Sequence, residues 1–258
     1  MGVDPALAAY EAFAAVYNDF NHANDYEMWL GRALLPEMQR HGLQEGGRAL
    51  DVGCGTGRAF EPLQRRGWQI HGCDLSPAML ERAAKEGGDD VALTVADMRE
   101  LPRLGKFDLV LSLNDSVNYL LGDDDLVRAL GGIRANLAED GLLVFDVNSS
   151  STYALGYSEV REVEHRESRW VWRGQGEVAP SVFEAKIEGD RLEPIKHLER
   201  FRSEHEVREA MREAGLQTLA SLGMSEADGE VVLSAPPDES RDYKVIFIGA
   251  VDEGRAKR

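Results

Sequence analysis

Three glycines and an acid within residues 48–76 have the types and spacing of a small-molecule binding site. In "RALDVGCGTGRAFEPLQRRGWQIHGCDLS", Gly53, Gly55 and Gly57 follow an apolar run, and Asp74 ends the next apolar run. A glycine loop that leads from a strand into a helix presents unpaired N–H groups and the positive end of the helix dipole. Such a site attracts a phosphate or a carboxylate, so three donors come into question: NAD, a nucleoside triphosphate and S-adenosylmethionine (SAM).

The spacing of the glycines separates these donors. A nucleoside triphosphate loop requires GxxxxGK[S/T], and this loop contains no Gly-Lys pair. A dinucleotide loop prefers GxGxxG, but Arg58 stands where the third glycine would be. The more open GxGxG loop favours a donor without phosphates, whose own carboxylate and ammonium groups lie beside the backbone.

Two acids at expected strand ends indicate an adenosine-containing ligand. The carboxylate of Asp74 can accept hydrogen bonds from both hydroxyls of a ribose, which suits NAD and SAM alike. In "VADMRELP", Asp97 is followed by the N–H of Met98. This pair can bind the amino group and a ring nitrogen of adenine.

The elements that must position these residues alternate between strand and helix from about residue 46. Expected strands cover 48–53, 69–74, 91–97, 107–113, 142–148, 216–222 and 243–251, and expected helices lie near 57–66, 77–86 and 124–138. Short apolar strands that alternate with helices predict a parallel sheet covered on both faces. The fold class is therefore α/β, a Rossmann-like seven-stranded sheet with helices on both faces.

Two further segments flank or interrupt this pattern. Residues 1–45 are expected to be helical, with Asp4 as N-cap before Pro5, and to form an N-terminal lid. Residues 150–201 lack a helical period, so we expect an antiparallel β insertion after the fifth strand that covers the acceptor site. The Rossmann-like domain then comprises 46–149 and 202–258, where Ser203 and Glu206 have the spacing of a capping box.

The sequence resembles class I SAM-dependent methyltransferases, and within them the bacterial small-molecule group. The resemblance rests on "LDVGCGTG", "GCDLSPAMLERA", "VADMREL", "FDLVLSLNDSVNYL" and "GLLVFDVNS", which occur in the family's order over about residues 48–149. It extends to the C-terminus through "HLERF…REAGL" and "YKVIFIGAV". The resemblance implies SAM as cofactor and S-adenosylhomocysteine as product.

The same resemblance implies roles for individual residues. The glycine loop with Cys54 is expected to approach the methionine part of SAM, and Asp51 to order the loop or meet the ammonium through water. Asp74 is expected to hold the ribose. The remaining cofactor contacts are expected from Leu75 and Met79 against the adenine, Asp97 and Met98 at its edge, Leu113 and Asn114 at the amino group, and Tyr17 from the lid.

The methyl acceptor is expected to lie beyond the fourth and fifth strands. Because the sulfonium already activates the methyl group, transfer to a nitrogen or oxygen by in-line displacement requires positioning above all. Asp115, Tyr17 and His197 are the candidate catalytic groups, with Asp115 orienting an ammonium or taking its proton. Candidate acceptor contacts are Asp115, Asn118, Tyr119, Asn148, Trp170 and Trp172, although the tryptophans also suit a small hydrophobic core.

The composition limits the kinds of partner that we expect this protein to bind. A net charge of −17 disfavours nucleic acid, which needs a basic face. No run of about 18 apolar residues predicts a membrane span, and the start of the chain resembles no secretory signal, so we expect a cytoplasmic protein. The two cysteines, Cys54 and Cys73, have no metal-ligand spacing, and no metal is expected. The expected partners are a small-molecule acceptor and a second copy of the chain in a homodimer.

The leading hypothesis is a SAM-dependent methyltransferase of a small molecule. A protein that binds SAM or S-adenosylhomocysteine without catalysis would keep the same glycines and acids, so the sequence leaves this alternative open. An NAD-dependent dehydrogenase is disfavoured by the GxGxG loop and by Asp97 with Met98.

Overall fold

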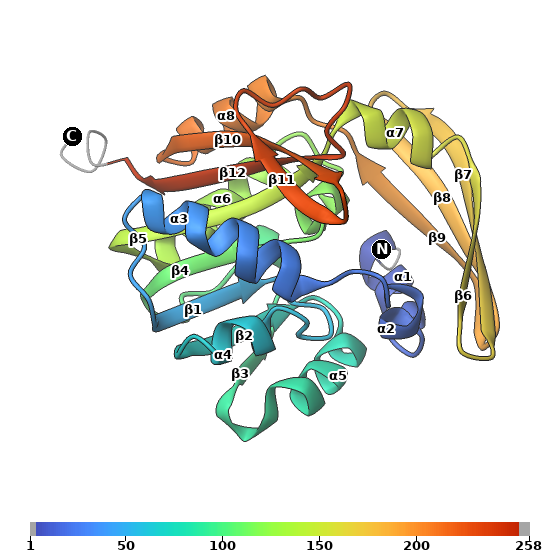
Figure 1. The fold of residues 1–258 in the computed structure, drawn as a ribbon, viewed down its shortest axis with the longest axis horizontal. Coiled ribbons are helices and arrows are strands. Elements are labelled where there is room, and N and C mark those ends of the chain that lie inside the picture. Colours follow the sequence, from blue (N-terminus) through green and yellow to red (C-terminus); the bar gives the residue numbers. More distant parts are fainter. Residues whose placement is uncertain (1–3, 253–258) are drawn as a thin grey trace.

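The computed structural model describes residues 4–252, with the side chain of Asp89 excepted (Figure 1). Residues 1–3 and 253–258, the outer ends of the expected lid and Rossmann-like domain, lie outside the described residues.

A mixed eight-stranded sheet forms the centre of the fold. Its order is β11-β10-β12-β5-β4-β1-β2-β3, and β1 to β5 run parallel to their neighbours among themselves, whereas β10, β11 and β12 are antiparallel. The strands are β1 Gly47–Val52, β2 Trp68–Asp74, β3 Ala92–Val95, β4 Phe107–Ser112, β5 Leu137–Asn148, β10 Leu216–Ala227, β11 Glu230–Ser234 and β12 Lys244–Val251. The chain order reverses between β1 and β4, and open α/β sheets bind ligands at the carboxyl edge of such a reversal.

Helices cover both faces of this sheet, as the alternating pattern predicts. They are α4 Phe60–Gln64, α5 Pro77–Gly87, α6 Asp125–Asn136 and α8 Glu204–Glu213, with short 3₁₀ turns η2 Gly88–Asp90, η3 Met98–Glu100 and η4 Ser116–Tyr119. Leu130 of α6 and Met211 of α8 belong to the hydrophobic core on one face, and Phe60 of α4 and Leu80 of α5 to the core on the other. The capping box of Ser203 at the start of α8 is confirmed.

The sheet contains the seven expected strands and one more. Strand β11 lies between the expected strands 216–222 and 243–251, and it forms a hairpin with β10. Asp228 and Gly229 both have positive φ, the conformation that a two-residue hairpin turn requires. Val231 and Leu233 then pack against the core, which fixes this added edge strand.

The N-terminal segment is helical, as expected, but not uniformly α-helical. It comprises α1 Pro5–Phe13, α2 Tyr17–Phe20, the π-helical η1 Glu27–Leu34 and α3 Leu35–Arg40. Asp4 caps α1 by accepting hydrogen bonds from the N–H groups of Ala6 and Leu7. Pro36 lies in the first turn of α3, where its missing N–H costs no hydrogen bond.

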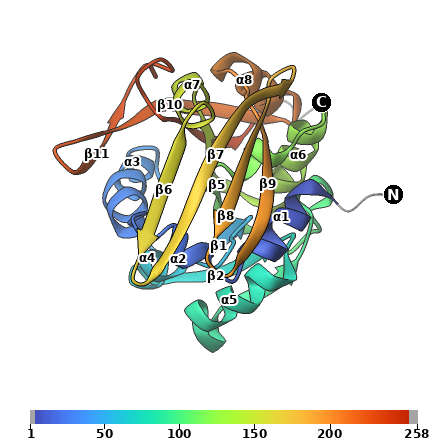
Figure 2. The same ribbon diagram turned by 90° about the vertical axis from the view of Figure 1, so that its right-hand side faces the viewer.

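A second sheet, of four antiparallel strands, follows β5. After α7 Ser150–Gly156 come β6 Val160–His165, β7 Ser168–Ala179, β8 Val182–Gly189 and β9 Leu192–Arg200, which pair in that order. Figures 1 and 2 show α1 and α2 enclosed between this sheet and the rest of the molecule. Phe13 and Phe20 of these helices share a core with Trp170 and Ile187 of the sheet. The division of the chain into three domains stays a prediction.

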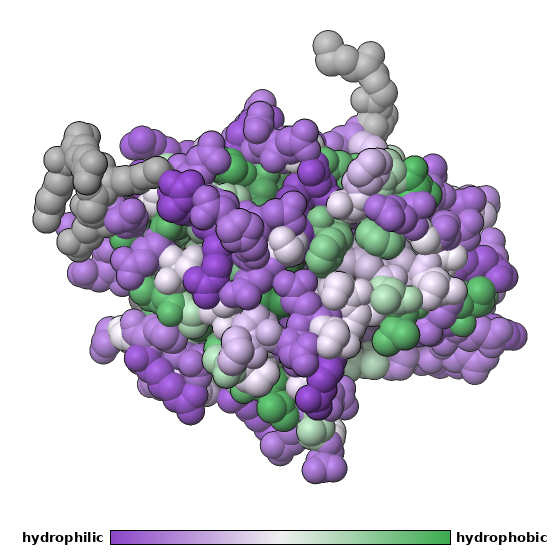
Figure 3. All heavy atoms as spheres, turned by 90° about the horizontal axis from the view of Figure 1, so that it is seen from above, coloured by the Kyte–Doolittle hydropathy of each residue, from purple (hydrophilic) through white to green (hydrophobic). Residues whose placement is uncertain are grey.

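The surface agrees with the acidic composition. The face in Figure 3 is hydrophilic over most of its area, with separate hydrophobic areas between. None of the helices that the structure describes is both long and apolar enough to cross a membrane.

Candidate active site

A cavity lies between the N-terminal helices and the carboxyl edge of β1, β2 and β4. It encloses about 860 Å³, including its opening to solvent. The structure brings ten of the expected cofactor residues to its wall: Tyr17, Gly53, Cys54, Gly55, Asp74, Leu75, Asp97, Met98, Leu113 and Asn114. We call this space the cofactor cavity.

The glycine loop is shaped by backbone conformation that side chains disfavour. Gly53 has φ +75°, and a Cβ there would lie 3.0 Å from the side chain of Ser116 and 3.4 Å from Cε of Met98. The missing side chain therefore leaves the backbone open to close approach. The N–H of Gly55 donates a 2.8 Å hydrogen bond to Asp74.

Asp74 is held by the loop that it faces. One carboxylate oxygen accepts from Gly55 and the other from the N–H of Ser76 at 2.9 Å. Burial raises the pKa of Asp74, and these N–H groups offset part of that shift. An ionised carboxylate has about four acceptor positions, so Asp74 retains capacity for two ribose hydroxyls.

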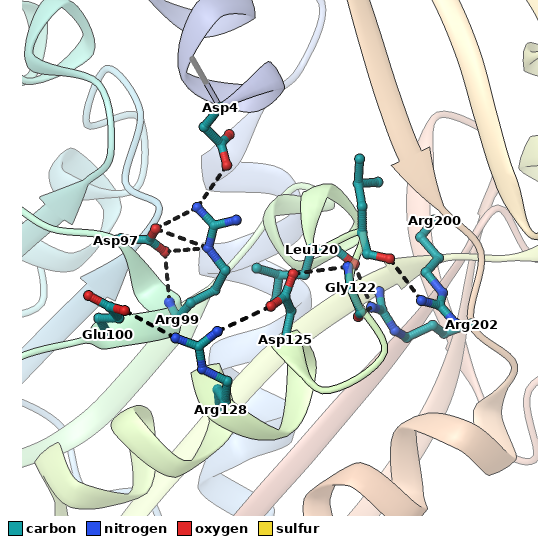
Figure 4. A network of polar contacts seen from close by, with 11 residues as sticks. Asp4, Asp97, Arg99, Glu100, Leu120, Gly122, Asp125, Arg128, Arg200 and Arg202 are labelled. Carbon is teal, nitrogen blue, oxygen red and sulfur yellow. Dashed lines mark hydrogen bonds and ion pairs between the residues drawn. The ribbon is translucent and has the colours of Figure 1, made fainter. Parts of the chain in front are cut away.

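Arg99 joins the adenine side of the cofactor cavity to the lid (Figure 4). Its guanidinium contacts both oxygens of Asp97, at 2.9 Å from Nε, and reaches Asp4 at 2.7 Å from Nη2. Although burial raises the pKa of Asp97, Arg99 lowers it below its ordinary value overall. Asp97 is thus an ionised acceptor at neutral pH, and the start of α1 is fixed above it.

Two more side chains fix the lid over the cofactor cavity through three hydrogen bonds. Asn18 accepts a 2.6 Å hydrogen bond from Thr56 of the glycine loop. Glu11 accepts from the hydroxyl of Ser76 at 2.6 Å and from the N–H of Ala78 at 3.0 Å. The N-terminal helices are therefore closed over the site in this structure.

Three expected cofactor residues do not line the cavity. Asp51 is buried behind the loop, and burial together with Asp74 raises its pKa to about 7. Gly57 packs on Phe60, whose ring would be 2.5 Å from a Cβ, so this glycine serves helix packing. Met79 is fully buried in the core beneath α1 with Phe13, which contradicts its expected contact with adenine.

A second cavity continues from the first toward the small sheet. It encloses about 740 Å³, including its opening, and we call it the acceptor cavity. Four side chains line both cavities, namely Tyr10, Tyr17, Asn114 and Tyr119. Of the expected acceptor contacts, Asp115, Tyr119, Asn148 and Trp172 line the acceptor cavity, as does His197.

Asp115 belongs to a buried ionic cluster. Nζ of Lys244 lies 2.7 Å from Oδ1 of Asp115 and 2.7 Å from Oδ2 of Asp146. Burial raises the pKa of Asp115 to about 7, and Lys244 offsets part of this shift. Although burial alone would lower it, the two carboxylates raise the pKa of Lys244.

Glu199 adds a further carboxylate to the wall of the acceptor cavity. It is 2% exposed and accepts hydrogen bonds from Asn148 at 2.9 Å and from the hydroxyl of Tyr153 at 3.1 Å. Burial raises its pKa. Asn148, expected to contact the acceptor, therefore also holds Glu199 in place.

His197, a candidate catalytic group, is buried. Its Nδ1 lies 2.9 Å from the hydroxyl of Tyr119, and burial lowers its pKa to about 4. The imidazole is thus neutral at physiological pH.

Tyr17 lies where the cofactor cavity meets the acceptor cavity. Its hydroxyl accepts a 3.3 Å hydrogen bond from the side chain of Asn114. Burial raises the pKa of Tyr17 to about 12, so the phenol stays protonated. This protonation state suits a positioning group and does not suit a general base.

Two expected acceptor contacts lie outside the cavity. The side chain of Asn118 donates to the carbonyl of Arg200 at 2.9 Å and accepts from the N–H of Asn148 at 3.0 Å, so it joins η4 to β9 and β5. Trp170 is fully buried in the core between α2 and the small sheet. Both were wrong as acceptor contacts because backbone bonding and core packing occupy them.

Several residues that line or support the two cavities were not predicted from the sequence. Asp146 lies two residues before Asn148 in β5 and could have been identified as a strand-end acid. Glu199, Lys244 and Tyr10 come from segments whose placement depends on tertiary packing. Among the residues that the structure describes, no cluster of His, Cys, Asp or Glu is suited to a metal ion.

The fold and the cofactor cavity define an α/β protein with a candidate ligand site at the carboxyl edge of its sheet. Residues 49–141 match the methyltransferase-domain family. The chain is 32% identical over 192 residues to the putative methyltransferase YqeM of Bacillus subtilis, covering 64% of this chain and 74% of that protein. The chain belongs to the SAM-dependent methyltransferase family, so it is an enzyme and SAM is its cofactor.

Other comparisons agree with this membership. A putative methyltransferase of Geobacillus (GWCH70_2453) is 37% identical over 144 residues, which cover 55% of this chain and 58% of the relative. The dTDP-3-amino-3,4,6-trideoxy-alpha-D-glucopyranose N,N-dimethyltransferase of Streptomyces venezuelae is 31% identical over 166 residues, covering 60% of this chain and 69% of that protein. In fold, the chain is similar to a SAM-dependent methyltransferase of Clostridium acetobutylicum, with TM-score 0.76, 23% identity and coverage of 94% and 98%.

Proposed function

We propose that this enzyme transfers a methyl group from SAM to the nitrogen of a small-molecule amine. The proposal rests on the charges of the side chains that line the acceptor cavity and of those that contact them. Asp115, Glu199 and Asp146 contribute three carboxylates. The ammonium of Lys244 contacts two of them, and Arg161, which also lines the cavity, contacts none of them. Buried carboxylates are destabilised without a compensating cation, which a protonated amine would supply.

Aromatic side chains complete a cation site at the junction of the two cavities. Tyr10 and Tyr119 lie edge to face at 5.1 Å between ring centroids, and Tyr17 lies 6.2 Å from Tyr10. Aromatic rings attract cations through their quadrupole, and the effect grows when the cation is desolvated. An ammonium acceptor is favoured here over a neutral hydroxyl.

Asp115 is the group we assign to the acceptor's proton. Lys244 engages Oδ1 of Asp115, so Oδ2 is the oxygen available to the acceptor. A pKa of about 7 lets the carboxylate hold an ammonium and accept its proton near neutral pH. SAM supplies a methyl group already activated on a sulfonium, so nitrogen attack releases S-adenosylhomocysteine without further activation.

The remaining residues position the reactants. Tyr17 and Asn114 line both cavities and are hydrogen-bonded to each other, so they can define the point at which the two reactants meet. Closure of the lid by Asp4, Glu11 and Asn18 would exclude water from that point.

The test is the release of S-adenosylhomocysteine with matched amine and alcohol acceptors. We expect turnover with primary or secondary amines and none above background with the corresponding alcohols. Turnover with alcohols alone would overturn the assignment to nitrogen. Tight SAM binding with no turnover on either panel would instead favour a protein that binds SAM without catalysis.

We also propose that the enzyme acts in the cytoplasm and that its substrate is not a nucleic acid. A net charge of −17 supports the second point, because binding to phosphate backbones requires a basic surface. A homodimer stays a prediction, and sedimentation velocity of the purified chain tests it.

A further inference from the structure

One face of the four-stranded sheet lines the acceptor cavity, and its polar groups are divided between the two outer strands. Arg161 pairs with Trp172, Trp172 with Ile187, and Ile187 with Ile195, so these residues form one row across β6, β7, β8 and β9. His197 and Glu199 continue along β9 on the same face, since alternate residues of a strand share a face. Arg161 therefore lies at the opposite edge of this face from the buried acid Glu199.

Arg161 is the only Lys or Arg among the described residues that line the acceptor cavity. Its guanidinium carbon lies 5.7 Å from the ring centroid of Trp172. The indole N–H of Trp172 donates a 2.7 Å hydrogen bond to the carbonyl of Gly156, which fixes the ring beneath the arginine. The cation is thus oriented by a rigid aromatic surface.

The neighbouring acids do not neutralise Arg161. Glu162 and Glu164 lie on the other face of β6, where both contact Arg169. Arg161 forms no ion pair with any residue from 4 to 252 for which a position is described. Arg161 is exposed on the edge strand β6, and its unpaired guanidinium at the cavity wall is available to a ligand anion.

We propose that Arg161 and Trp172 form a subsite for an anionic group at the far end of the acceptor. This inference rests on the proposed amine methylation, and it names the substrate class: an elongated amine that carries a carboxylate or phosphate. Adjacent strands are about 4.8 Å apart, and Glu199 lies four residues along β9 from Ile195, which is level with Trp172, so the guanidinium over Trp172 and the acid on β9 are on the order of 10–16 Å apart. An α-amino acid, whose two charges are adjacent, is too short to reach both.

The test compares probes of different length and charge by calorimetry on the protein loaded with S-adenosylhomocysteine. In 6-aminohexyl phosphate and 7-aminoheptanoate the two charges are about 10 Å apart when the chain is extended, and in O-phosphoethanolamine about 5 Å. Hexylamine provides the amine without the anion. We expect both long anionic probes to bind at least tenfold more tightly than hexylamine and O-phosphoethanolamine.

Arg161→Gln should remove that tenfold advantage and leave the affinity for hexylamine unchanged. The matched control is Arg166→Gln, at an exposed position between β6 and β7 that lines neither cavity, and it should keep the advantage. Arg161→Lys should retain part of it, because the charge remains but the planar group over Trp172 does not. A preference for one long probe over the other distinguishes phosphate from carboxylate.

Two results would overturn the subsite: equal affinity of the wild type for long anionic probes and hexylamine, or an advantage that survives Arg161→Gln. Methyl transfer to the same probes is measured separately. If no amine is methylated but Arg161→Gln still weakens the long anionic probes, the proposed function fails and the anion subsite stands. If hexylamine is methylated and no anion preference is found, the proposed function stands and the anion subsite fails.

Discussion

The ammonium of Lys244 lies 2.7 Å from Oδ1 of Asp115, at the wall of the acceptor cavity. The same ammonium contacts Asp146, which also accepts the backbone N–H groups of Asn114 at 2.6 Å and Asp115 at 2.8 Å. Asn114 and Asp115 both have φ near +60°, a conformation that costs energy outside glycine. Asp146 therefore stabilises the strained turn from which Asn114 lines the cofactor cavity and Asp115 lines the acceptor cavity.

Asp146→Asn should destabilise the protein by about 3–5 kcal/mol, the usual cost of removing one member of a buried ion pair. The amide carries no charge, so Lys244 keeps Asp115 as its remaining carboxylate partner, and the NH₂ group of the amide would oppose a donor. Urea denaturation measures the loss.

Lys244→Met provides the control for this prediction. In Asp146→Asn with Lys244→Met the buried ammonium that has lost one of its two carboxylates is gone, so the double variant should be more stable than the sum of the single effects predicts. Strict additivity would show that the two residues do not act as a pair.

Asp115→Asn should reduce kcat by about 10²-fold or more, the usual contribution of a general base, and leave the affinity for S-adenosylhomocysteine unchanged. Wild-type kcat/KM should fall as pH drops below about 7, because protonation of Asp115 removes both its charge and its capacity to accept a proton. A pH–rate profile with one acceptor isolates this effect, since the titration of the amine itself persists in the variant. If kcat/KM of Asp115→Asn falls at low pH as it does in the wild type, another group causes that fall.

The cofactor half of the site could be predicted because its signals are local. Gly53 follows β1 and Asp74 ends β2. Parallel pairing brings these two strand ends to one edge of the sheet, so sequence order alone implies that the residues are close. The same logic placed Asp97 and Leu113 at the cofactor cavity. The predicted contact of Met79 with adenine was wrong, because the sequence does not show which side of α5 faces the cavity and which side faces α1.

The acceptor half could not be predicted in the same way. Glu199 and Trp172 reach the cavity through antiparallel pairing of a late insertion, and Tyr10 reaches it from the first helix. Such contacts join segments far apart in the sequence, and a strand's alternation identifies two faces without saying which is inside. Trp170 and Trp172 share one face, yet packing of α2 closes one off and leaves the other at the cavity.

Asp74→Asn should weaken S-adenosylhomocysteine binding at least tenfold, which corresponds to about 1.4 kcal/mol. The amide retains one acceptor for Gly55 or Ser76 but replaces the charged acceptor that the ribose hydroxyls require. Isothermal titration calorimetry measures the affinity, and near-UV circular dichroism checks that the variant is folded. Unchanged affinity in a folded variant would contradict the ribose assignment.

Asp51→Asn should stabilise the ligand-free protein more at pH 8 than at pH 5. Burial raises the pKa of Asp51 from 3.8 in the unfolded chain to about 7 in the folded protein. Between these values the folded state binds the extra proton, so Asp51 lowers stability as pH rises from about 4 to about 7. A shift of this size corresponds to a cost on the order of 4 kcal/mol above pH 7, of which the smaller part is already present at pH 5. Urea denaturation of both proteins at pH 5 and pH 8 gives the comparison, in which other titrating groups cancel. If the stability difference between wild type and variant is the same at both pH values, Asp51 is already ionised at pH 5 in the folded protein. The ligand-free enzyme would then hold this carboxylate through an interaction that compensates its burial.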